Sequence, residues 1–357
     1  MFRYSLKKIK YSFFVLWGVV TIVFLLFNVL PGDPARMMLD KREDAEQLQA
    51  INKKYGFDKS IAEQYFLYLN DVSPISIHNN QINTFTYLES KKYRYTKILE
   101  FETRTLVLKF PFLRNSFVSG QDVGSIILKT FPNTFILALT SILIALALGL
   151  MLGLISAVYK DSFLDKAILS ISAIGMSVPS FFSAILIAWI FGFVLQKYTG
   201  LNMSGSLYEV DDYGRGAYLE LKNLILPALT LGIRPLAVIT QLCRNSVLEI
   251  MKLDYVRTAT SKGLKKTTIL FRHVLRNALN PVITVISGWF ASLLAGAVFV
   301  EYIFGWNGIG KEIVDALNKL DLPVVMGSVL FIAFLFVLVN ILVDLMYRLL
   351  DPRVNIE

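Results

Sequence analysis

Six long apolar stretches dominate this chain of 357 residues and limit the folds open to it. A helix needs about 20 apolar residues to cross a hydrocarbon layer of about 30 Å. Apolar residues make up 55% of the chain and charged residues 18%, too few to cover a soluble core of this size. The sequence therefore predicts an all-α membrane protein with six transmembrane helices, at about 11–30, 133–158, 167–195, 224–244, 282–303 and 324–347.

Lysine and arginine residues predict the orientation of the chain, because they accumulate in short cytoplasmic loops. With the N-terminus in the cytoplasm, the short inner segments hold sixteen of them and the short outer loops five. The inner ones are Arg3, Lys7, Lys8, Lys10, Lys160, Lys166, the eight from Arg244 to Arg276, Arg348 and Arg353. The outer ones are Lys197, Arg215, Lys222, Lys311 and Lys319. The sequence thus predicts a multi-pass protein of the cytoplasmic membrane with both termini inside. The first stretch lacks an Ala-x-Ala cleavage site and is expected to be retained.

Helix-breaking residues interrupt two of the predicted spans. They are Gly175 and Pro179 in the third span, and Pro227, Gly232 and Pro235 in the fourth. Such breaks are tolerated where neighbouring groups satisfy the freed backbone, and they either allow bending or form static kinks. Gly149 and Gly153 have the spacing of small residues that lets two helices approach closely.

The long segment 32–130 is predicted to lie outside the membrane. Residues 35–70 are expected to be partly helical, with a turn at 55–58 and an amphipathic run from Ile61 to Leu69. Alternation over 98–110 predicts a strand, or half of a hairpin. The segment fits either a small external subdomain or an elaboration without a specific partner.

Sites for chemistry are not evident in the sequence. Cys243 is the only cysteine, and His78 and His273 are isolated, as ordinary loop residues would be. Residues 305–311 match a phosphate loop, but Glu312 stands where that loop needs serine or threonine. We therefore expect a turn there, no metal, no cofactor and no catalytic residue.

Four polar residues at or within the predicted spans are candidates for function, because burying such groups in lipid is costly. Glu301 and Asp344 fall near helix ends, where a structural role is favoured. Arg234 and Asn340 sit deeper and are the candidate residues of a polar pathway.

The basic loop at 254–281 has a helical pattern of its own. Residues 254–262 predict a short helix that ends at Gly263 as a left-handed cap. A second helix from about Leu264 would carry an apolar stripe formed by Phe271, Val274, Leu275 and Ala278. A short helix held by two spans suits a groove on a soluble partner, and it equally suits a surface of anionic lipid.

The same loop resembles the ATPase-coupling loop of binding-protein-dependent permeases of ABC importers, of the oligopeptide/dipeptide/nickel permease family. The resemblance lies in 254–264 and 272–281, in Pro31-Gly32-Asp33-Pro34 and in Tyr55-Gly56-Phe57-Asp58-Lys59. It extends to residues 304–310, 321–325, 340–347 and 351–353. Arg257 and Thr258 depart from the general permease pattern as the peptide branch does. Residues 71–111 are inserted relative to shorter members.

The resemblance implies a fold like that of type I importer permeases and the first permease subunit type. It implies an N-terminal helix (1–31), an external α/β-containing segment (32–130) and a five-helix core (131–357) with the coupling loop at 245–281. The partners would be a second homologous permease in a heterodimer, two cytoplasmic ATP-binding subunits and an external solute-binding protein, with peptides as solute. The coupling residues carried over are Asp254, Tyr255, Arg257, Ala259, Lys262, Gly263 and Leu264.

A secondary transporter or channel without an ATPase is the alternative class. It predicts ionisable residues clustered at the midplane of discontinuous helices, and inverted internal repeats. Neither feature is clear in the sequence.

Overall fold

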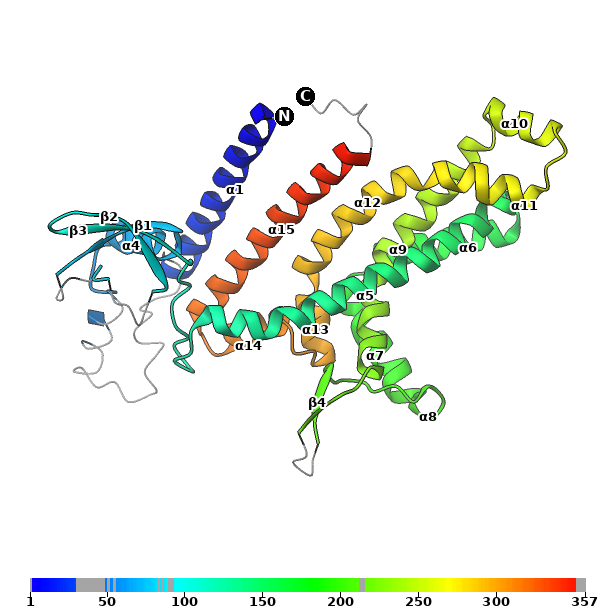
Figure 1. Ribbon diagram of the computed structural model, residues 1–357. Helices are drawn as coiled ribbons and strands as arrows, with labels where there is room; N and C mark the ends of the chain where they lie inside the picture. The colour runs from blue at the N-terminus through cyan, green and yellow to red at the C-terminus, as the bar shows by residue number, and fades with distance from the viewer. Residues whose placement is uncertain are drawn as a thin grey trace. The chain divides into compact units, whose positions relative to one another are not determined.

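The computed structural model describes residues 2–29, 49, 52–53, 56–81, 84, 86–88, 93–211 and 216–350 (Figure 1). These fall into two compact units, one of Met1–Lys129 with Glu312–Phe334 and one of Thr130–Lys311 with Leu335–Glu357. The Pro31–Pro34 motif lies outside the described residues. The domain boundaries predicted at 31 and 130 stay a prediction.

Helices account for most of the described chain, as the sequence predicts. The long ones are α1 (Phe2–Val29), α5 (Val123–Val158), α6 (Phe163–Ser177), α9 (Lys222–Ile250), α12 (Leu275–Gly296) and α15 (Leu322–Leu350). The shorter ones are α4 (Ile61–Val72), α7 (Ser180–Trp189), α8 (Gln196–Thr199), α10 (Asp254–Ser261), α11 (Lys266–Thr268), α13 (Val298–Phe304) and α14 (Ile309–Asn318). Two π-helical segments, η1 (Ile190–Val194) and η2 (Ile269–Val274), continue α7 and α11. The described residues contain four helices apolar enough to span a membrane, or six if two bent pairs each count as one span.

The third predicted span is a bent pair. Helices α6 and α7 meet at an angle of 110° around Val178 and Pro179. Proline forces the preceding residue out of the helical region, and Val178 is extended, with φ −77° and ψ 131°. The proline read as a helix breaker is therefore the place where this span breaks.

Helix α9 behaves differently from its sequence pattern, because it runs unbroken through Pro227 and Pro235. Each proline removes one backbone donor, which neighbouring helices and polar side chains can offset. The fifth span also differs: helix α12 ends at Gly296, short of the predicted 303, and α13 follows after Ala297. A second bend, of 42°, falls at Pro281.

Glycines bring α5 and α9 into close contact. A Cβ atom at Gly153 would lie 2.7 Å from both Cys243 Cβ and Thr240 O. A Cβ at Gly149 would lie 2.8 Å from Ile239 Cγ2. The Gly149/Gly153 spacing therefore marks a contact in which the two backbones nearly touch.

In the first unit, α4 packs against membrane-spanning helices. Val20, Val23 and Phe24 of α1 share one apolar cluster with Tyr68 of α4 and Met326 and Leu330 of α15. The Tyr65 hydroxyl is hydrogen bonded to Thr21 Oγ1 at 2.6 Å. Ser60 and Glu63 form a reciprocal capping box that starts α4.

A three-stranded antiparallel sheet follows α4, in the order β1 (Ile75–Asn79), β3 (Arg104–Lys109), β2 (Tyr95–Glu100). The alternating residues over 98–110 therefore belong to two strands, the end of β2 and all of β3, which form a hairpin with its turn at 101–103. The turn is closed by the Phe101 N–H, which donates to Arg104 O at 2.8 Å. A second small hairpin, β4 (Tyr208–Val210) with β5 (Ala217–Leu219), precedes α9.

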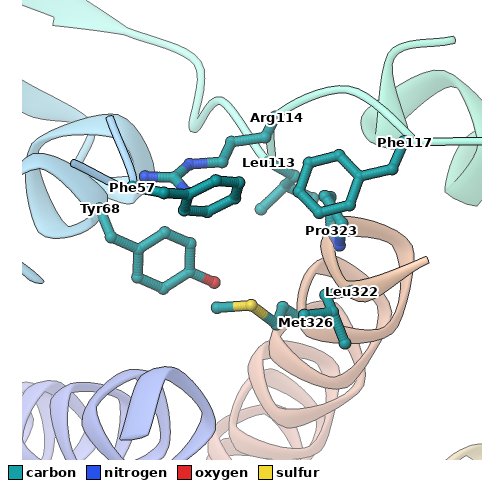
Figure 2. A pocket seen from close by; sticks show the side chains of 8 residues that line it. All are labelled: Phe57, Tyr68, Leu113, Arg114, Phe117, Leu322, Pro323 and Met326. Carbon is teal, nitrogen blue, oxygen red and sulfur yellow. The ribbon is translucent and has the colours of Figure 1, made fainter. Parts of the chain in front are cut away.

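Loop 111–122 connects the sheet to α15 through Asp321. That carboxylate accepts hydrogen bonds from Ser116 Oγ at 2.5 Å and from the backbone N–H of Phe117 at 3.0 Å. Beside it, Figure 2 shows Tyr68 and Arg114 directed toward Met326 and Phe57 around a cavity of about 10 Å³. A space of that size holds one water at most, so these groups form a packing contact and not a ligand site.

Enlarging Gly153 tests the close contact between α5 and α9. We expect Gly153→Leu to lower the free energy of unfolding by about 1–3 kcal/mol, as overpacking does, because the colliding atoms include backbone. Gly18→Leu is the matched control, since nothing lies within 4 Å of that position. Thermal unfolding of both variants in detergent measures the difference, and equal stability would contradict the contact.

Candidate coupling loop and solute pathway

Helix α10 has the bounds and caps that its sequence predicts. It runs over Asp254–Ser261, Lys262 follows as the C-cap, and Gly263 adopts φ +76°. The Gly263 N–H donates to Thr260 O at 3.0 Å. A positive φ favours glycine, so Gly263 allows the chain to turn sharply after the helix. Figure 1 shows α10 beyond the ends of α9 and α12.

Helix α10 is attached to the protein through a narrow apolar stripe. Val256 is 5% exposed and Ala259 7%, and both join a cluster with Ile269, Val274 and Ala278. All the other residues of α10 are exposed. The helix therefore contacts its own chain through this stripe, and most of its surface is available to solvent or to a partner.

A tyrosine clasp fastens α10 to the start of α12. The Tyr255 hydroxyl donates to His273 O at 3.2 Å and accepts from Asn277 Nδ2 at 2.8 Å. Tyr255 is named on the resemblance alone, whereas Asn277 is not among the expected site residues. The clasp and the apolar stripe together attach α10 to η2 and to the start of α12.

The charged residues of α10 that the resemblance assigns to coupling are exposed to solvent. Asp254 and Arg257 form an ion pair at 3.6 Å, with side chains 96% and 73% exposed. A pair so exposed contributes little to stability. Lys262 and Leu264 are exposed as well. These side chains are thus available for contacts with another molecule.

The predicted apolar stripe of the second helix is partly wrong. Val274 and Ala278 are buried as predicted, but Phe271 is 60% exposed and Ile269 is buried instead. The reason is the π-helical turn η2 over Ile269–Val274, which inserts a residue and shifts the helical phase. Phe271 therefore adds an apolar side chain to the exposed surface of the loop.

An ion pair missed by sequence reasoning joins α6 to α9 close to the loop. Arg244 donates from Nε to Asp165 Oδ1 and from Nη2 to Asp165 Oδ2, both at 2.7 Å. Asp165 also accepts from Ser156 Oγ and from the Asp161 N–H. The carboxylate is 2% exposed and the arginine 15%. The sequence signal that could have indicated this pair is an acidic residue, Asp165, just before the third predicted span and a basic residue, Arg244, at the end of the fourth.

The phosphate-loop match forms a turn at Gly305, but its last residues begin helix α14, so the expected turn is limited to the residues before Ile309. A carboxylate accepts hydrogen bonds from the N–H groups at the start of that helix. Glu301 is fully buried, and its Oε2 accepts from the Gly310 N–H at 2.6 Å and the Lys311 N–H at 3.3 Å. A Cβ at Gly308 would lie 2.4 Å from the same oxygen. Two N–H groups that would face a phosphate in a phosphate loop are thus already bonded to Glu301. These contacts fit a structural role for Glu301, although the residue is fully buried and does not lie at a solvated helix end.

The two candidate pathway residues lie in different settings. Arg234 lines a cavity of about 150 Å³, together with Ser180, Ser183, Thr230, Trp289 and others, beside the α6–α7 break. Its Nη2 donates to Val178 O at 3.4 Å, a carbonyl at that break. Asn340 does not line this cavity, and its amide donates back to Phe336 O at 2.8 Å.

A polar stripe extends from Arg234 along α9. Gln241 and Asn245 follow it at helical spacing, so the three share one face. Arg234 and Asn245 are exposed and Gln241 is half-buried. Polar side chains facing hydrocarbon are costly, so this face is a candidate for the polar pathway.

Metal and histidine chemistry finds no support in the described part of the chain. No group of three or more histidine, cysteine or acidic side chains gathers there. His78 is not in a loop as expected: it lies in β1, is 1% exposed and is hydrogen bonded to Ser76 Oγ at 3.0 Å. His273 lies in η2, with its carbonyl in the tyrosine clasp.

Two family models match the chain. Residues 149–356 match the binding-protein-dependent transport system inner membrane component, and residues 1–83 match its N-terminal region. Among solved structures, the MetNI methionine ABC transporter in an inward-facing conformation covers 63% of this chain, with a TM-score of 0.48 and 15% identity.

Curated relatives align over nearly the whole length. A di/tripeptide transport system permease protein of Pseudomonas aeruginosa is 33% identical, covering 95% of this chain and 94% of the relative. A dipeptide transport system permease protein of Bacillus subtilis is 31% identical over 100% and 99%. A glutathione transport system permease protein of Pectobacterium atrosepticum is 30% identical over 99% of each.

Removing the charge of Asp165 tests the buried ion pair. We expect Asp165→Asn to lower the free energy of unfolding by about 1–3 kcal/mol, because the half-buried Arg244 loses its charged partner. Asp161→Asn is the matched control, since its pair with Lys160 is 3.5 Å long and exposed. Denaturation of both proteins measures the effect. If Asp165→Asn lowers the free energy of unfolding no more than Asp161→Asn does, the Asp165–Arg244 pair does not stabilise the protein.

Proposed function

We infer the function from one premise: the chain belongs to the family of binding-protein-dependent transport system inner membrane components. Membership makes it a membrane-embedded permease subunit and implies that it works with other permease, ATPase and binding-protein subunits. We propose that the transported solute is a peptide. The support is that three relatives are named for di- and tripeptides, dipeptides and glutathione, itself a small peptide.

The proposed arrangement has both termini and α10 in the cytoplasm. Sixteen lysines and arginines on the short segments of that side, against five on the other, support this orientation. The partners would be a second homologous permease, forming the pathway as a heterodimer, two cytoplasmic ATP-binding subunits, and a solute-binding protein on the outer side.

The observation that carries the coupling proposal is that α10 contacts its own chain along one narrow stripe, while its other side chains are exposed. The helix touches its own chain through Val256, Ala259 and the Tyr255 clasp. Its remaining side chains, with the exposed Phe271 nearby, fit a groove on an ATPase subunit in the helix-in-groove mode. Closure of the ATPases would then displace α10 and α12 together. Asp254, Arg257, Lys262 and Leu264 would contact the ATPase, and Gly263 would keep the helix at its angle.

The proposed solute pathway follows the polar face of α9. The cavity at Arg234 is lined by hydroxyl groups from α7, α9 and α12. It lies beside the break between α6 and α7, where the helical hydrogen-bond pattern is interrupted. A guanidinium there can attract a peptide carboxylate. Asn340 stays a candidate only, because its amide is engaged with its own helix.

The competing function is a secondary transporter or channel without an ATPase, and the observation in its favour is the broken α6–α7 pair beside a cavity. Mild extraction of the tagged chain from its native membrane separates the two. Co-purification of an ATP-hydrolysing subunit is expected, and a pure chain that still transports in liposomes would support the competitor.

A proline at position 263 tests coupling. We expect Gly263→Pro to abolish transport-stimulated ATP hydrolysis in the assembled complex, because proline cannot adopt φ +76° and lacks the N–H that bonds Thr260. Gly263→Asn is the control, since asparagine tolerates this conformation. Charge reversal at Asp254 and Arg257 is expected to give the same loss. Membrane insertion, checked by protease protection, should be unchanged, and normal uptake would contradict the role of the loop.

Loss of charge at position 234 tests the pathway. We expect Arg234→Gln to reduce uptake of a free peptide about tenfold or more, the effect of about 1.4 kcal/mol, and to affect a C-terminally amidated peptide less. Asn245→Ala on the same face is the control for the stripe, because it has no charge to lose. Equal losses for the two peptides would show that Arg234 acts structurally, through Val178 O.

A further inference from the structure

The sheet in the first unit has its polarity reversed. Its inner face carries Ser76, His78, Thr105 and Lys109, which are 4% exposed or less. Their polar groups are satisfied inside: Lys109 Nζ, for example, donates to Asp71 O at 2.9 Å. A sheet with one solvated face normally turns its polar residues outward. Here the polar residues point inward.

The outer face is correspondingly apolar. Ile75 pairs with Leu108, and Ile77 pairs with Leu106, which in turn pairs with Leu99. Paired residues in antiparallel strands point to the same side, so these five side chains form one surface. Four of them, Ile75, Ile77, Leu99 and Leu108, are 50–58% exposed. We call this surface the apolar sheet face.

The depth of the sheet follows from what α4 contacts. Thr21, the partner of Tyr65, lies six residues before the end of the apolar window of α1, about 9 Å inside it along the helix. Leu330, in the same cluster as Tyr68, lies about 12 Å beyond the start of the α15 span. Helix α4 therefore reaches the outer part of the hydrocarbon layer.

The sheet is tied directly to that helix. Strand β1 begins three residues after α4 ends, and the Ile77 N–H donates to Asn70 Oδ1 of α4 at 3.0 Å. This attachment keeps the apolar sheet face beside α4, within reach of the boundary where acyl chains meet headgroups. Amphipathic helices bury their apolar face about 5–10 Å into that boundary, and an apolar sheet face at the same depth would meet the same surroundings.

We propose that the apolar sheet face rests on the membrane, in the leaflet where α1 ends, so that this segment is an interfacial anchor. Phe101 at the hairpin turn and Phe110 after β3 are 61% and 79% exposed, as aromatic residues at a lipid interface are. Exposed Arg104 offers its guanidinium to lipid headgroups. The anchor needs neither a peptide solute nor a particular orientation of the chain.

Fluorescence quenching in nanodiscs tests the anchor in the full assembly. Cys243, the only cysteine, is buried, so a thiol-reactive dye selects an introduced cysteine. The dye would be attached at Ile77→Cys or Leu108→Cys, with Ser119→Cys in an exposed loop as the control. The quenchers are lipids brominated on their acyl chains and aqueous iodide.

The expected result is strong quenching by brominated lipid at positions 77 and 108 with little by iodide, and the reverse at 119. Iodide quenching at 77 and 108 equal to that at 119 would overturn the anchor. Protection from both quenchers would also overturn it, because a protein partner would then cover the face.

A second variant tests the same face without a label on it. Ile77→Asp is expected to reduce quenching by brominated lipid at Leu108→Cys and to raise quenching by iodide there, while Ile77→Val changes neither. Unchanged quenching in Ile77→Asp would contradict the proposal. Because Ile77 is 53% exposed, the acidic side chain is not forced into the core of the unit.

Discussion

Hydrocarbon offers no water to backbone groups, and much of this structure follows from that constraint. Hydroxyl groups on the spanning helices bond back to carbonyls one turn earlier, as Thr230 does to Leu226 O and Thr240 to Leu236 O. At the α6–α7 break, Arg234 donates to the carbonyl of Val178. In the turn after α13, Glu301 accepts the N–H groups of Gly310 and Lys311. Hydroxyl groups thus find partners inside the regular helices, and Arg234 and Glu301 bond to backbone groups where the helices begin or end.

The sequence predicted those parts of the fold that depend on local chemistry. The lengths of the apolar stretches predicted the spans, Pro179 predicted the break in the third span, and Gly263 predicted the C-terminal cap of α10. It did not predict what depends on distant contacts. The continuity of α9 through Pro227 and Pro235 was not expected, and neither was β1, which pairs with β3 from the far side of the predicted strand region.

The candidate site divides in the same way. Asp254 to Leu264 were named because they share a recognisable string, and they lie together on one loop. The residues that hold the loop in place come from elsewhere: Asn277 clasps Tyr255, and Arg244 pairs with a carboxylate 79 positions earlier. Phe271 was assigned to the wrong face because a π-helical turn leaves no clear mark in residue spacing. Local pattern thus located the loop, and only the structure showed its support.

The contact between Asp321 and loop 111–122 has a consequence for how the chain is made. The first compact unit consists of the first 129 residues and of residues 312–334, so it lacks a component until the last span has been synthesised. Domains tend to fold as units during synthesis, N-terminal first, but this one cannot. Its N-terminal part must wait, with the Asp321 side of its interface missing, while some 180 residues are inserted. A truncation that removes everything from residue 312 onward would therefore leave the first compact unit without its C-terminal part.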